Sequence, residues 1–421
     1  MQPDWLEMDR RHVWHPYTQH ATAEPPLPVV GGEGAYLVLA DGTRLLDAVS
    51  SWWVTLHGHA HPAIAEAVAA QAAQLEQVIF AGFTHEPAAR LAAELVEVLP
   101  AGLERVFYSD DGSTAVEVAL KIALQSWSNR GERRTLVAAL ENAYHGDTFG
   151  AMSASARGVF TEAYAEHLFQ VARLPDPSGG DTLAALDRLL EERGGELAAV
   201  IVEPLLLAAG GMRMYGGDVL RGIRARTAAA GIPLIADEVA TGFGRTGPLF
   251  ACGGAGVQPD LICLSKGVTG GFLPLGVTAA TGALFEAFRG TDRRRTLFHG
   301  HSFTANPISC AAARVSLGLL DGACERRRAG IAAAHRAGLR TLEGHPAVRR
   351  PRVLGTVAAF DLEEEGGYLS PAAAGLAAFA RREGVLLRPL GSVVYLLPPY
   401  CTTPDEIGHV WDVIRRYLES R

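Results

Sequence analysis

The sequence predicts an α/β fold, with a large domain built on a mainly parallel sheet and a smaller α+β domain. Three apolar runs support this prediction, and each ends in polar residues: AAVIVEP, IPLIADE and DLICLSK, between residues 198 and 266. Strands that are nearly continuous in Ile, Val and Leu are buried on both faces, as in a parallel sheet covered by helices. Helical or loop segments separate the runs, as parallel strands require.

The part of the chain before these runs predicts alternating short elements. The stretch GAYLVLADGTRLLDAVS favours short strands around an Asp-Gly turn. Amphipathic or apolar patterns then predict two helices, a short strand, a third helix and another strand. These elements are expected at Ala63–Gln77, Pro87–Leu99, Arg105–Ser109, Ser113–Ser128 and Thr135–Leu140.

After about residue 303 the pattern changes to long helices and short strand-like pieces. Helices are expected over Pro307–Leu320, Cys324–Leu342 and Pro404–Leu418, with strand-like pieces around Val353–Leu362, Val385–Arg388 and Val393–Leu397. We therefore divide the chain into three parts. Residues 1–50 contribute to the small domain, residues 51–303 form the large α/β domain, and residues 304–421 form the small α+β domain.

Composition excludes several classes of partner. The chain of 421 residues has 48% hydrophobic and 20% charged residues, a formal net charge of −8 and a pI near 6.0, which argues against a nucleic-acid partner. No apolar run reaches the length of a membrane span, and the N-terminus lacks the order of a signal peptide. Five scattered cysteines fit neither a disulfide framework nor a CxxC metal site. We therefore expect a cytoplasmic protein without a membrane partner.

The three apolar runs place polar side chains at the ends of buried strands. Glu203, Asp237 and Lys266 stand at these three ends. In mainly parallel sheets, ligands bind at the carboxyl ends of the strands. This coincidence is the first indication of a functional site.

Lys266 is unusual because the chain almost always uses arginine. Only two of its 38 Lys and Arg residues are lysine, Lys121 and Lys266. Lys121 follows Glu117 by four residues, which predicts an ordinary ion pair on a helix. An arginine cannot act as an amine nucleophile, whereas the amine of lysine can lose its proton when it is desolvated. Lys266 is therefore the candidate for Schiff-base chemistry.

Two further features indicate which cofactor this lysine serves. Asp237 ends a strand 29 residues before Lys266, a separation that suits one crossover between neighbouring strands. A carboxylate at that position can keep the pyridine nitrogen of pyridoxal phosphate (PLP) protonated, so that the ring withdraws electrons. The Gly112-Ser113 turn opens a predicted helix, whose first N–H groups suit a phosphate. Together, these features predict a PLP enzyme.

Other polar residues have more than one interpretation. The stretch HGHAH, residues 57–61, has three alternating histidines but no carboxylate or cysteine beside them, so we expect no metal site. Glu203 is either a partner of an arginine such as Arg388 or Arg245, or a structural carboxylate at a strand end. Arg245 either lines a substrate pocket or anchors a loop.

With these residues, the chain resembles the class III, fold-type-I PLP aminotransferases. The stretches IADEVATGFGRTG and LSKGVTGG carry the resemblance, which covers essentially the whole chain. It implies a homodimer with active sites at the subunit interface. It also implies that Lys266 holds the cofactor covalently and that Asp237 contacts the pyridine nitrogen.

A narrower resemblance is to the branch of this class that works in biotin synthesis. It rests on WHPYT, SSWW, YHGDTFGAMS, AAGGM and RPLGSVVYLLPPY. This branch aminates the ketone of 8-amino-7-oxononanoate, usually with S-adenosylmethionine as donor, although some relatives use lysine. The alternatives are a class III ω-aminotransferase with another keto or aldehyde acceptor, and a cofactor-free descendant.

The resemblance also implies the site residues. Lys266 and Asp237 would be catalytic. The residues expected to bind the cofactor are Gly112, Ser113, Tyr144, Asp237, Lys266, His301 and Ser302. Those expected to bind substrates are Tyr17, Trp52, Tyr144, Asp147, Gly300, Arg388 and Tyr400.

Two of these expectations concern particular chemistry. Arg388 suits a substrate carboxylate, and Asp147 suits the ammonium or sulfonium charge of a donor. The loop with Gly300 is expected to reach the phosphate of the other subunit. It has His301-Ser302 where the family usually has Pro-Thr, and the serine keeps the hydroxyl group.

Overall fold

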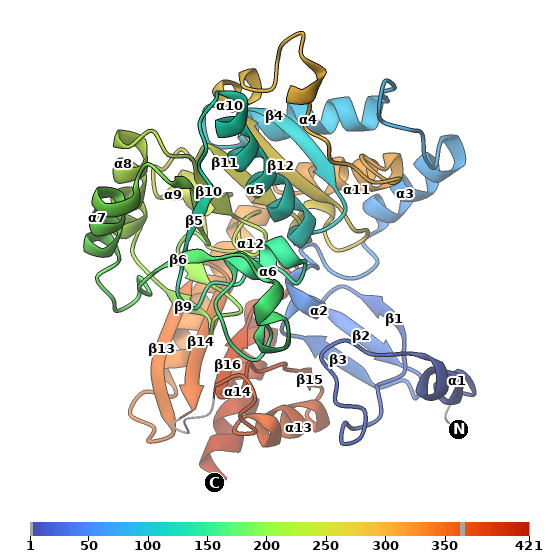
Figure 1. Cartoon of the computed structure of the whole chain (residues 1–421). Coiled ribbons are helices and arrows are strands. Elements are labelled where there is room, and N and C mark those ends of the chain that lie inside the picture. The colour runs from blue at the N-terminus through green and yellow to red at the C-terminus, as the bar shows by residue number, and fades with distance from the viewer. Residues whose placement is uncertain (1–2, 363–366, 421) are drawn as a thin grey trace.

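The computed structural model describes residues 3–362 and 367–420. A seven-stranded sheet with the order β4-β12-β11-β10-β7-β5-β6 forms the centre of its larger part (Figure 1). The five strands from β11 to β6 are parallel, whereas β12 pairs antiparallel with β11 and β4. The predicted mainly parallel sheet is confirmed. The strands are β4 (Leu103–Ser109), β5 (Leu136–Leu140), β6 (Val171–Leu174), β7 (Leu197–Val202), β10 (Leu234–Asp237), β11 (Leu261–Leu264) and β12 (Gly276–Thr281).

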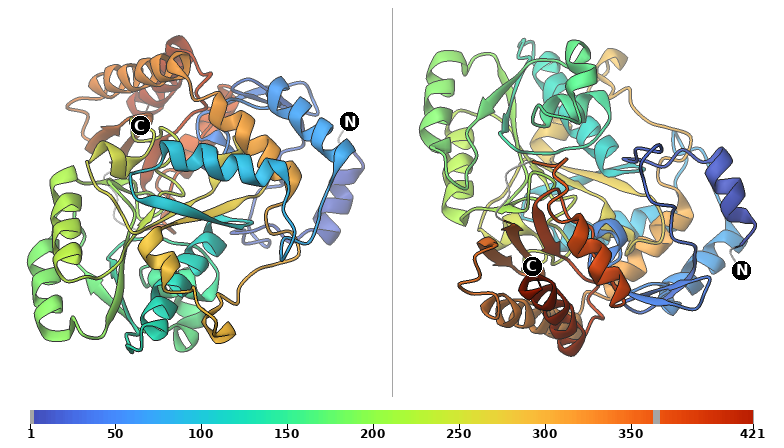
Figure 2. Two further views of the ribbon diagram at one scale, coloured as in Figure 1. Left: turned by 90° about the horizontal axis from the view of Figure 1, so that it is seen from above. Right: turned by 90° about the horizontal axis from the view of Figure 1, so that it is seen from below.

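Helices cover both faces of this sheet (Figure 2). Successive residues of β5 belong to different hydrophobic clusters, with Leu136, Ala138 and Leu140 in one and Val137 and Ala139 in the other. Because successive side chains of a strand point to opposite faces, each buried strand needs apolar residues at every position. The helices that contribute to these clusters include α4 (Glu86–Val98), α5 (Gly112–Asn129), α7 (Thr182–Arg193) and α8 (Gly217–Ala229).

The predicted helices occur within a few residues of their expected bounds. They are α3 (Pro62–Gln74), α4, α5, α11 (Pro307–Gly318), α12 (Gly322–Arg340) and α14 (Pro404–Glu419). The strand-like stretch 353–362 is not one continuous strand. Gly355, with φ +57°, lies in a turn between β13 (Val348–Leu354) and β14 (Val357–Leu362), which pair antiparallel.

Two smaller sheets contain the C-terminal strands, and one of them joins the two ends of the chain. The four-stranded sheet has the order β1-β2-β3-β15, and its strands β3 and β15 pair in parallel, with Leu46 opposite Val385. The three-stranded sheet has the order β13-β14-β16. The domain bounds at residues 50 and 303 stay a prediction. The strands not yet placed are β1 (Val29–Glu33), β2 (Tyr36–Leu39), β3 (Arg44–Asp47), β8 (Leu206–Leu207), β9 (Arg213–Met214), β15 (Val385–Leu386) and β16 (Val393–Leu396).

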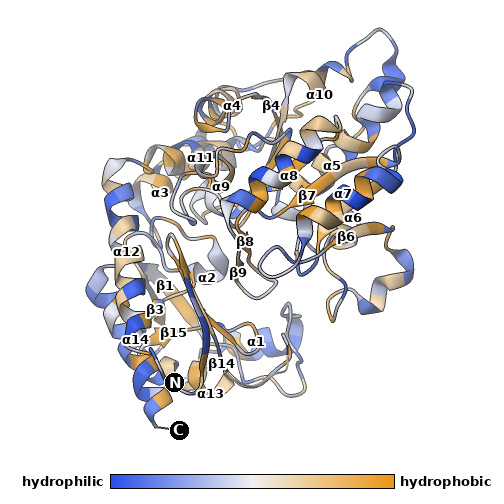
Figure 3. Ribbon diagram, turned by 90° about the vertical axis from the view of Figure 1, so that its left-hand side faces the viewer, coloured by the Kyte–Doolittle hydropathy of each residue, from blue (hydrophilic) through white to orange (hydrophobic). Residues whose placement is uncertain are grey.

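Short helices complete the structure. They include α1 (Trp5–His12), α2 (Ser50–Trp53), α6 (Phe149–Ala154), α9 (Ala251–Gly254), α10 (Gly282–Glu286) and α13 (Ala374–Arg382). In Figure 3 the strands of the large sheet carry apolar colours, while polar colours mark much of the outer helical surface. Across the described ranges, no helix combines the length and apolar character needed to cross a membrane.

The predicted ion pair between Glu117 and Lys121 is wrong. Oε1 of Glu117 instead accepts hydrogen bonds from the Thr148 hydroxyl and from the N–H groups of Gly150 and Ala151, so it stabilises the start of α6. Nζ of Lys121 lies 3.1 Å from Nδ1 of His299. The i,i+4 spacing was correct, but tertiary partners compete for both side chains.

Candidate functional site

The carboxyl ends of β7, β10 and β11 lie at one edge of the large sheet. Glu203, Asp237 and Lys266 follow or end these strands, and all three border one cavity with a volume of about 410 Å³. Gly112 and Ser113, at the start of α5, border the same cavity. The structure thus brings together the residues that the strand ends and the Gly-Ser turn singled out.

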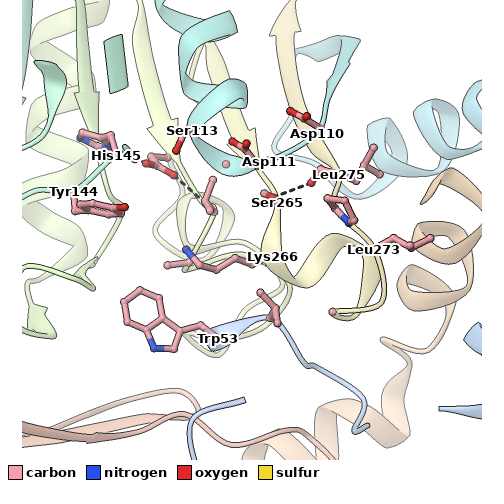
Figure 4. A pocket seen from close by; sticks show the side chains of 18 of the residues that line it. Trp53, Asp110, Asp111, Ser113, Tyr144, His145, Ser265, Lys266, Leu273 and Leu275 are labelled. Carbon is pink, nitrogen blue, oxygen red and sulfur yellow. Dashed lines mark hydrogen bonds and ion pairs between the residues drawn. The ribbon is translucent and has the colours of Figure 1, made fainter. Parts of the chain in front are cut away.

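Lys266 occupies a strained position inside this cavity. Its φ is +36°, which is unfavourable for a residue with a side chain. In Figure 4 the side chain lies between Tyr144 and Trp53, and Nζ is 5.0 Å from the centroid of the Trp53 ring. Burial lowers the pKa of Lys266, against the opposing effects of Asp237 and Glu203. The lowered pKa favours the neutral amine, which is the nucleophilic form.

Asp237 is held by a histidine that the sequence analysis did not single out. Oδ2 of Asp237 lies 2.7 Å from Nδ1 of His145, and both side chains are buried. Oδ1 accepts a hydrogen bond from the N–H of Val239. Nε2 of His145 is buried without a partner in the described part of the chain. The pair fixes the orientation of the carboxylate at the edge of the cavity.

Glu203 interacts with backbone groups rather than with the arginines considered above. Its carboxyl oxygens accept hydrogen bonds from the N–H of Tyr144 at 2.9 Å and of Ala208 at 3.1 Å. Burial, followed by the nearby Asp237, raises the pKa of Glu203 to about 8. The raised pKa favours the neutral form of Glu203 at pH 7.

Arg245 anchors loops instead of lining the cavity. Its guanidinium group is buried and donates hydrogen bonds to the carbonyl oxygens of Pro398, Trp53 and Thr55. These bonds connect the segment after β10 with the end of α2, with the segment that follows α2 and with the C-terminal part. Of the two roles considered for Arg245, the structure supports the loop anchor.

Five predicted substrate residues form a second group next to the cavity. The Cζ atom of Arg388 lies 4.1 Å from the centroid of the Trp52 ring, and the Tyr17 and Trp52 ring centroids are 5.4 Å apart. The Tyr17 hydroxyl donates a hydrogen bond to Oδ2 of Asp147 and lies 3.3 Å from the Tyr144 hydroxyl. The group offers apolar ring faces with one guanidinium and one carboxylate.

A strained turn presents Trp52 and Trp53 to this site. Ser50, Ser51 and Trp53 all have positive φ, between +50° and +69°. Asp47 holds the turn, because its Oδ2 accepts hydrogen bonds from the Ser51 hydroxyl and from Nε2 of His59, each at 2.9 Å. Strain of this kind persists only where surrounding contacts enforce it.

We expect Asp47→Ala to destabilise the fold and disorder the turn. Loss of the buried hydrogen bonds should cost about 3 kcal/mol. Burial alone would raise the pKa of Asp47, but the bonds from His59 and Ser51 outweigh it and lower the pKa. The stabilisation is therefore complete at neutral pH and is lost as the pH falls through the lowered pKa. Thermal unfolding at pH 7 and at pH 3 measures this; an equal loss at both pH values would contradict it.

The start of α5 fits the phosphate of the predicted cofactor. Asp111 caps the helix by accepting the N–H of Thr114 at 2.8 Å, so the first N–H groups, those of Gly112 and Ser113, stay available at the cavity. A Cβ atom on Gly146 would lie 2.1 Å from Oγ of Ser113, so only glycine allows this close approach. With Asp237 for the ring nitrogen and Lys266 for the aldehyde, the residues present fit PLP.

Tyr400 does not border the cavity of Lys266, and its role in substrate binding stays a prediction. Its side chain is fully buried, its hydroxyl donates a hydrogen bond to the carbonyl of Phe243, and its ring lies 5.0 Å from Cζ of Arg245. The ring packs in the interior next to the loop anchor. The C-terminal PPY motif therefore supports the loops that surround the site.

The loop with Gly300 lies at the rim of its own chain's cavity. Nε2 of His301 is 3.9 Å from Oδ1 of Asp110, a residue that borders the cavity. The carbonyl of Ser302 accepts a hydrogen bond from the side chain of Gln77. The expected contact of this loop with the phosphate of a second subunit stays a prediction.

Comparison with known proteins gives concordant matches over nearly the whole chain. The aminotransferase class-III family model matches residues 17–418. The chain is 53% identical to an adenosylmethionine-8-amino-7-oxononanoate aminotransferase of Synechococcus elongatus, over 97% of this chain and 99% of the relative. It is 41% identical to the protein of that name from Mycobacterium leprae, over 96% and 94%.

Solved structures of proteins from the same family are also similar to this chain. A protein of the same name from Methanocaldococcus jannaschii superposes with a TM-score of 0.94 at 32% identity, covering 99% of this chain and 98% of the other. An amine transaminase from an uncultivated Pseudomonas species, in a PLP-bound form, gives a TM-score of 0.89 at 32% identity, over 97% and 98%.

Proposed function

The chain belongs to the class III aminotransferases, which depend on PLP, and on this premise we propose that it aminates 8-amino-7-oxononanoate to 7,8-diaminononanoate, with S-adenosylmethionine as donor. The main support for this acceptor is the stacking of the Arg388 guanidinium group on the Trp52 ring, beside Tyr17. A long aliphatic keto acid needs an apolar wall for its chain and one cation for its carboxylate. The names of the full-length relatives support the same reaction.

The side chains at the cavity have different roles in the proposed reaction. When bound, PLP withdraws electrons from the carbon that carries the amino group. Asp237, whose carboxyl group is oriented by His145, would face the ring nitrogen. Nζ of Lys266, with its lowered pKa, accepts the proton from the donor's α-carbon as a general base. Tyr144 and Trp53 flank Lys266 and restrict the access of water to Nζ.

The identity of the acceptor is tested by comparing the turnover of different keto and aldehyde acceptors with the same amino donor. The enzyme loaded with PLP should convert 8-amino-7-oxononanoate to 7,8-diaminononanoate with S-adenosylmethionine, and product formation is measured by mass spectrometry. Succinate semialdehyde and pyruvate serve as competing acceptors. Faster turnover of either would replace the proposal with an ω-aminotransferase of different specificity.

We expect Arg388→Ala to raise KM for the keto acid by about 10²-fold with a smaller change in kcat. The guanidinium–carboxylate pair binds the ground state and the transition state alike, so its loss weakens binding more than chemistry. Steady-state kinetics with the keto acid varied measures this. Arg382→Ala is a suitable control, because Arg382 stacks on Phe379 in α13. An unchanged KM in Arg388→Ala would refute the carboxylate clamp.

We also propose that the enzyme is a cytoplasmic homodimer. Several large apolar side chains are exposed on two segments, namely Ile79, Phe83, Phe298 and Phe303, each more than 60% exposed. A second copy would cover them and bring its Ser302 loop towards the phosphate. Light scattering during size exclusion should give twice the chain mass; a monomer with full activity would contradict the shared site.

A further inference from the structure

The backbone around Lys266 is contacted from outside the cavity by a distant helix. A short 3₁₀ turn, Lys266–Thr269, follows β11 and includes the strained Lys266 backbone. The carbonyl oxygen of Gly267 accepts hydrogen bonds from the N–H of Gly270 at 2.9 Å and from the hydroxyl of Ser316 at 3.3 Å. Ser316 lies in α11, is buried and does not border the cavity. Its hydroxyl therefore holds the peptide next to Lys266 from behind.

The Ser316 hydroxyl is in turn oriented by His57. Nε2 of His57 lies 3.2 Å from Oγ of Ser316. Serine has one hydroxyl hydrogen and a carbonyl oxygen can only accept, so Ser316 donates to Gly267 and His57 donates to Ser316. Burial lowers the pKa of His57 to about 4, so the ring is neutral at pH 7 and its hydrogen is on Nε2. The groups whose charges also act on this ring are His61, Arg245 and Arg327.

Close packing keeps the turn next to these two side chains. A Cβ atom on Gly270, which has φ +66°, would lie 3.1 Å from Cδ2 of His57 and 3.2 Å from Oγ of Ser316. A Cβ atom on Gly267 would lie 2.9 Å from Cδ1 of Leu56. A side chain at either position would displace its neighbours, so glycine is what allows this close approach.

The chain segment that carries His57 also contacts the other end of Lys266. The Trp53 ring lies on one side of the side chain, with its centroid 5.0 Å from Nζ (Figure 4). The residue before Lys266 is fixed as well, because the Ser265 hydroxyl donates a hydrogen bond to the carbonyl of Leu275 at 2.8 Å. The lysine is thus held at the peptides on both sides and at its tip.

We propose that Ser316, oriented by His57, is a positioning residue that fixes the strained backbone of Lys266 and so directs Nζ at the cofactor site. The inference rests on the role of Lys266 in the proposed function. Both residues act through the carbonyl of Gly267 and touch neither substrate nor cofactor. A strained φ persists only where the surrounding structure enforces it. Without the hydrogen bond from Ser316, the turn can relax, and Nζ at the end of a long side chain moves with it.

The surroundings of Nζ are measurable without turnover, because the chain has only two lysines. The cofactor-free full-length protein is treated with a trace of acetic anhydride over a range of pH, and acetylation of Lys266 is quantified by peptide mass spectrometry, with Lys121 as internal standard. Burial lowers the pKa of Lys266. In Ser316→Ala, Nζ leaves its buried position, so the pH midpoint for Lys266 should rise by about half a unit or more. An unchanged midpoint would overturn the proposal.

The substitution leaves the charges around Nζ in place, so a shifted midpoint reports a change in position. The titratable groups that border the cavity with Lys266 are Asp110, Asp111, Tyr144, His145, Glu203 and Asp237. In the loaded enzyme, Ser316→Ala should lower kcat by about tenfold and leave KM for the keto acid nearly unchanged, because a misplaced amine affects the chemical step rather than substrate binding. A raised KM with an unchanged kcat would contradict the positioning role.

Ser126→Ala is the matched control. Ser126 is fully buried in α5, and its hydroxyl donates a hydrogen bond to the carbonyl of Ala123 in the same helix, outside the cavity. Both variants lose one buried hydrogen bond, so their thermal midpoints should fall by similar amounts. Only Ser316→Ala should change the acetylation midpoint of Lys266. An equal change in Ser126→Ala would show general destabilisation instead of positioning.

Two substitutions of His57 test the donor to Ser316. Glutamine keeps an N–H near the position of Nε2, whereas leucine has a similar size and no donor. His57→Gln should keep the Lys266 midpoint close to that of the parent, and His57→Leu should reproduce the shift of Ser316→Ala. Equal midpoints in the two His57 variants would refute the orienting hydrogen bond.

Failure of this inference is distinguishable from failure of the proposed function. The acetylation midpoints require neither cofactor nor substrate. An unchanged midpoint in Ser316→Ala, together with loss of turnover in Lys266→Arg, would refute the positioning role alone. Substantial turnover in Lys266→Arg would instead refute the role of Lys266 in the reaction.

Discussion

Lys266→Arg is expected to abolish turnover, lowering kcat by about 10⁴-fold or more, although the positive charge is retained. The reason is chemical: a guanidinium group does not lose its proton at neutral pH, so it can neither attack a carbonyl nor remove a proton from carbon. The position is prepared for an amine, because burial lowers the pKa of Lys266. Its strained backbone also directs the side chain between Tyr144 and Trp53.

The control for this experiment is Lys121→Arg, at the only other lysine of the chain. Nζ of Lys121 contacts His299 outside the catalytic cavity, and arginine can keep the charge there. We expect kcat of this variant to stay within about twofold of the parent. Single-turnover kinetics and the absorbance of the bound cofactor measure both variants. Substantial turnover in Lys266→Arg would refute the role of Lys266.

Asp237→Asn is expected to lower kcat by about 10²- to 10³-fold and to weaken cofactor binding. A fixed carboxylate against a cationic ring nitrogen is a preorganised electrostatic group, and such groups have effects of this size. The amide keeps the shape of the side chain but not its charge. It also disturbs the contact with Nδ1 of His145, which lies 2.7 Å from Oδ2.

The neighbouring residue supplies the control for Asp237. Glu238 is fully buried, and its oxygens accept hydrogen bonds from the N–H groups of Ala251 and Cys252, away from the cavity. Glu238→Gln should lower the thermal midpoint without a comparable loss of cofactor affinity. Cofactor dissociation constants from fluorescence titration compare the two variants. Equal loss of affinity in both would mean that the effect of Asp237→Asn is general destabilisation.

Much of the fold was predictable because its signals are local. The apolar runs around Val200, Ile235 and Ile262 read as buried strands without knowledge of their neighbours. Strand direction then followed, since parallel strands with intervening helices bring their carboxyl ends to one edge. The chemistry of Lys266 was also predictable from the sequence alone. Arginine cannot replace an amine that must lose its proton, and a retained lysine is conspicuous in a chain that otherwise uses arginine.

Contacts between distant loops were not predictable from such patterns. The His145–Asp237 pair spans 92 residues, and nothing near His145 in the sequence indicates its partner. The motif that contains Tyr400 predicts a substrate contact, and nothing in that motif indicates that the ring is buried beside Arg245. In each case the outcome depends on which surfaces meet after the sheets have formed.

The sequence was thus sufficient for the identity of the reactive groups, because their chemistry is a property of single side chains at strand ends. Only the tertiary structure decided their surroundings. The Asp47 bonds that hold the strained turn under Trp52, the raised pKa of Glu203 and the buried His145–Asp237 pair all arise from packing and burial. Burial and close packing depend on the simultaneous placement of segments that are far apart in the chain, and no local pattern encodes that placement.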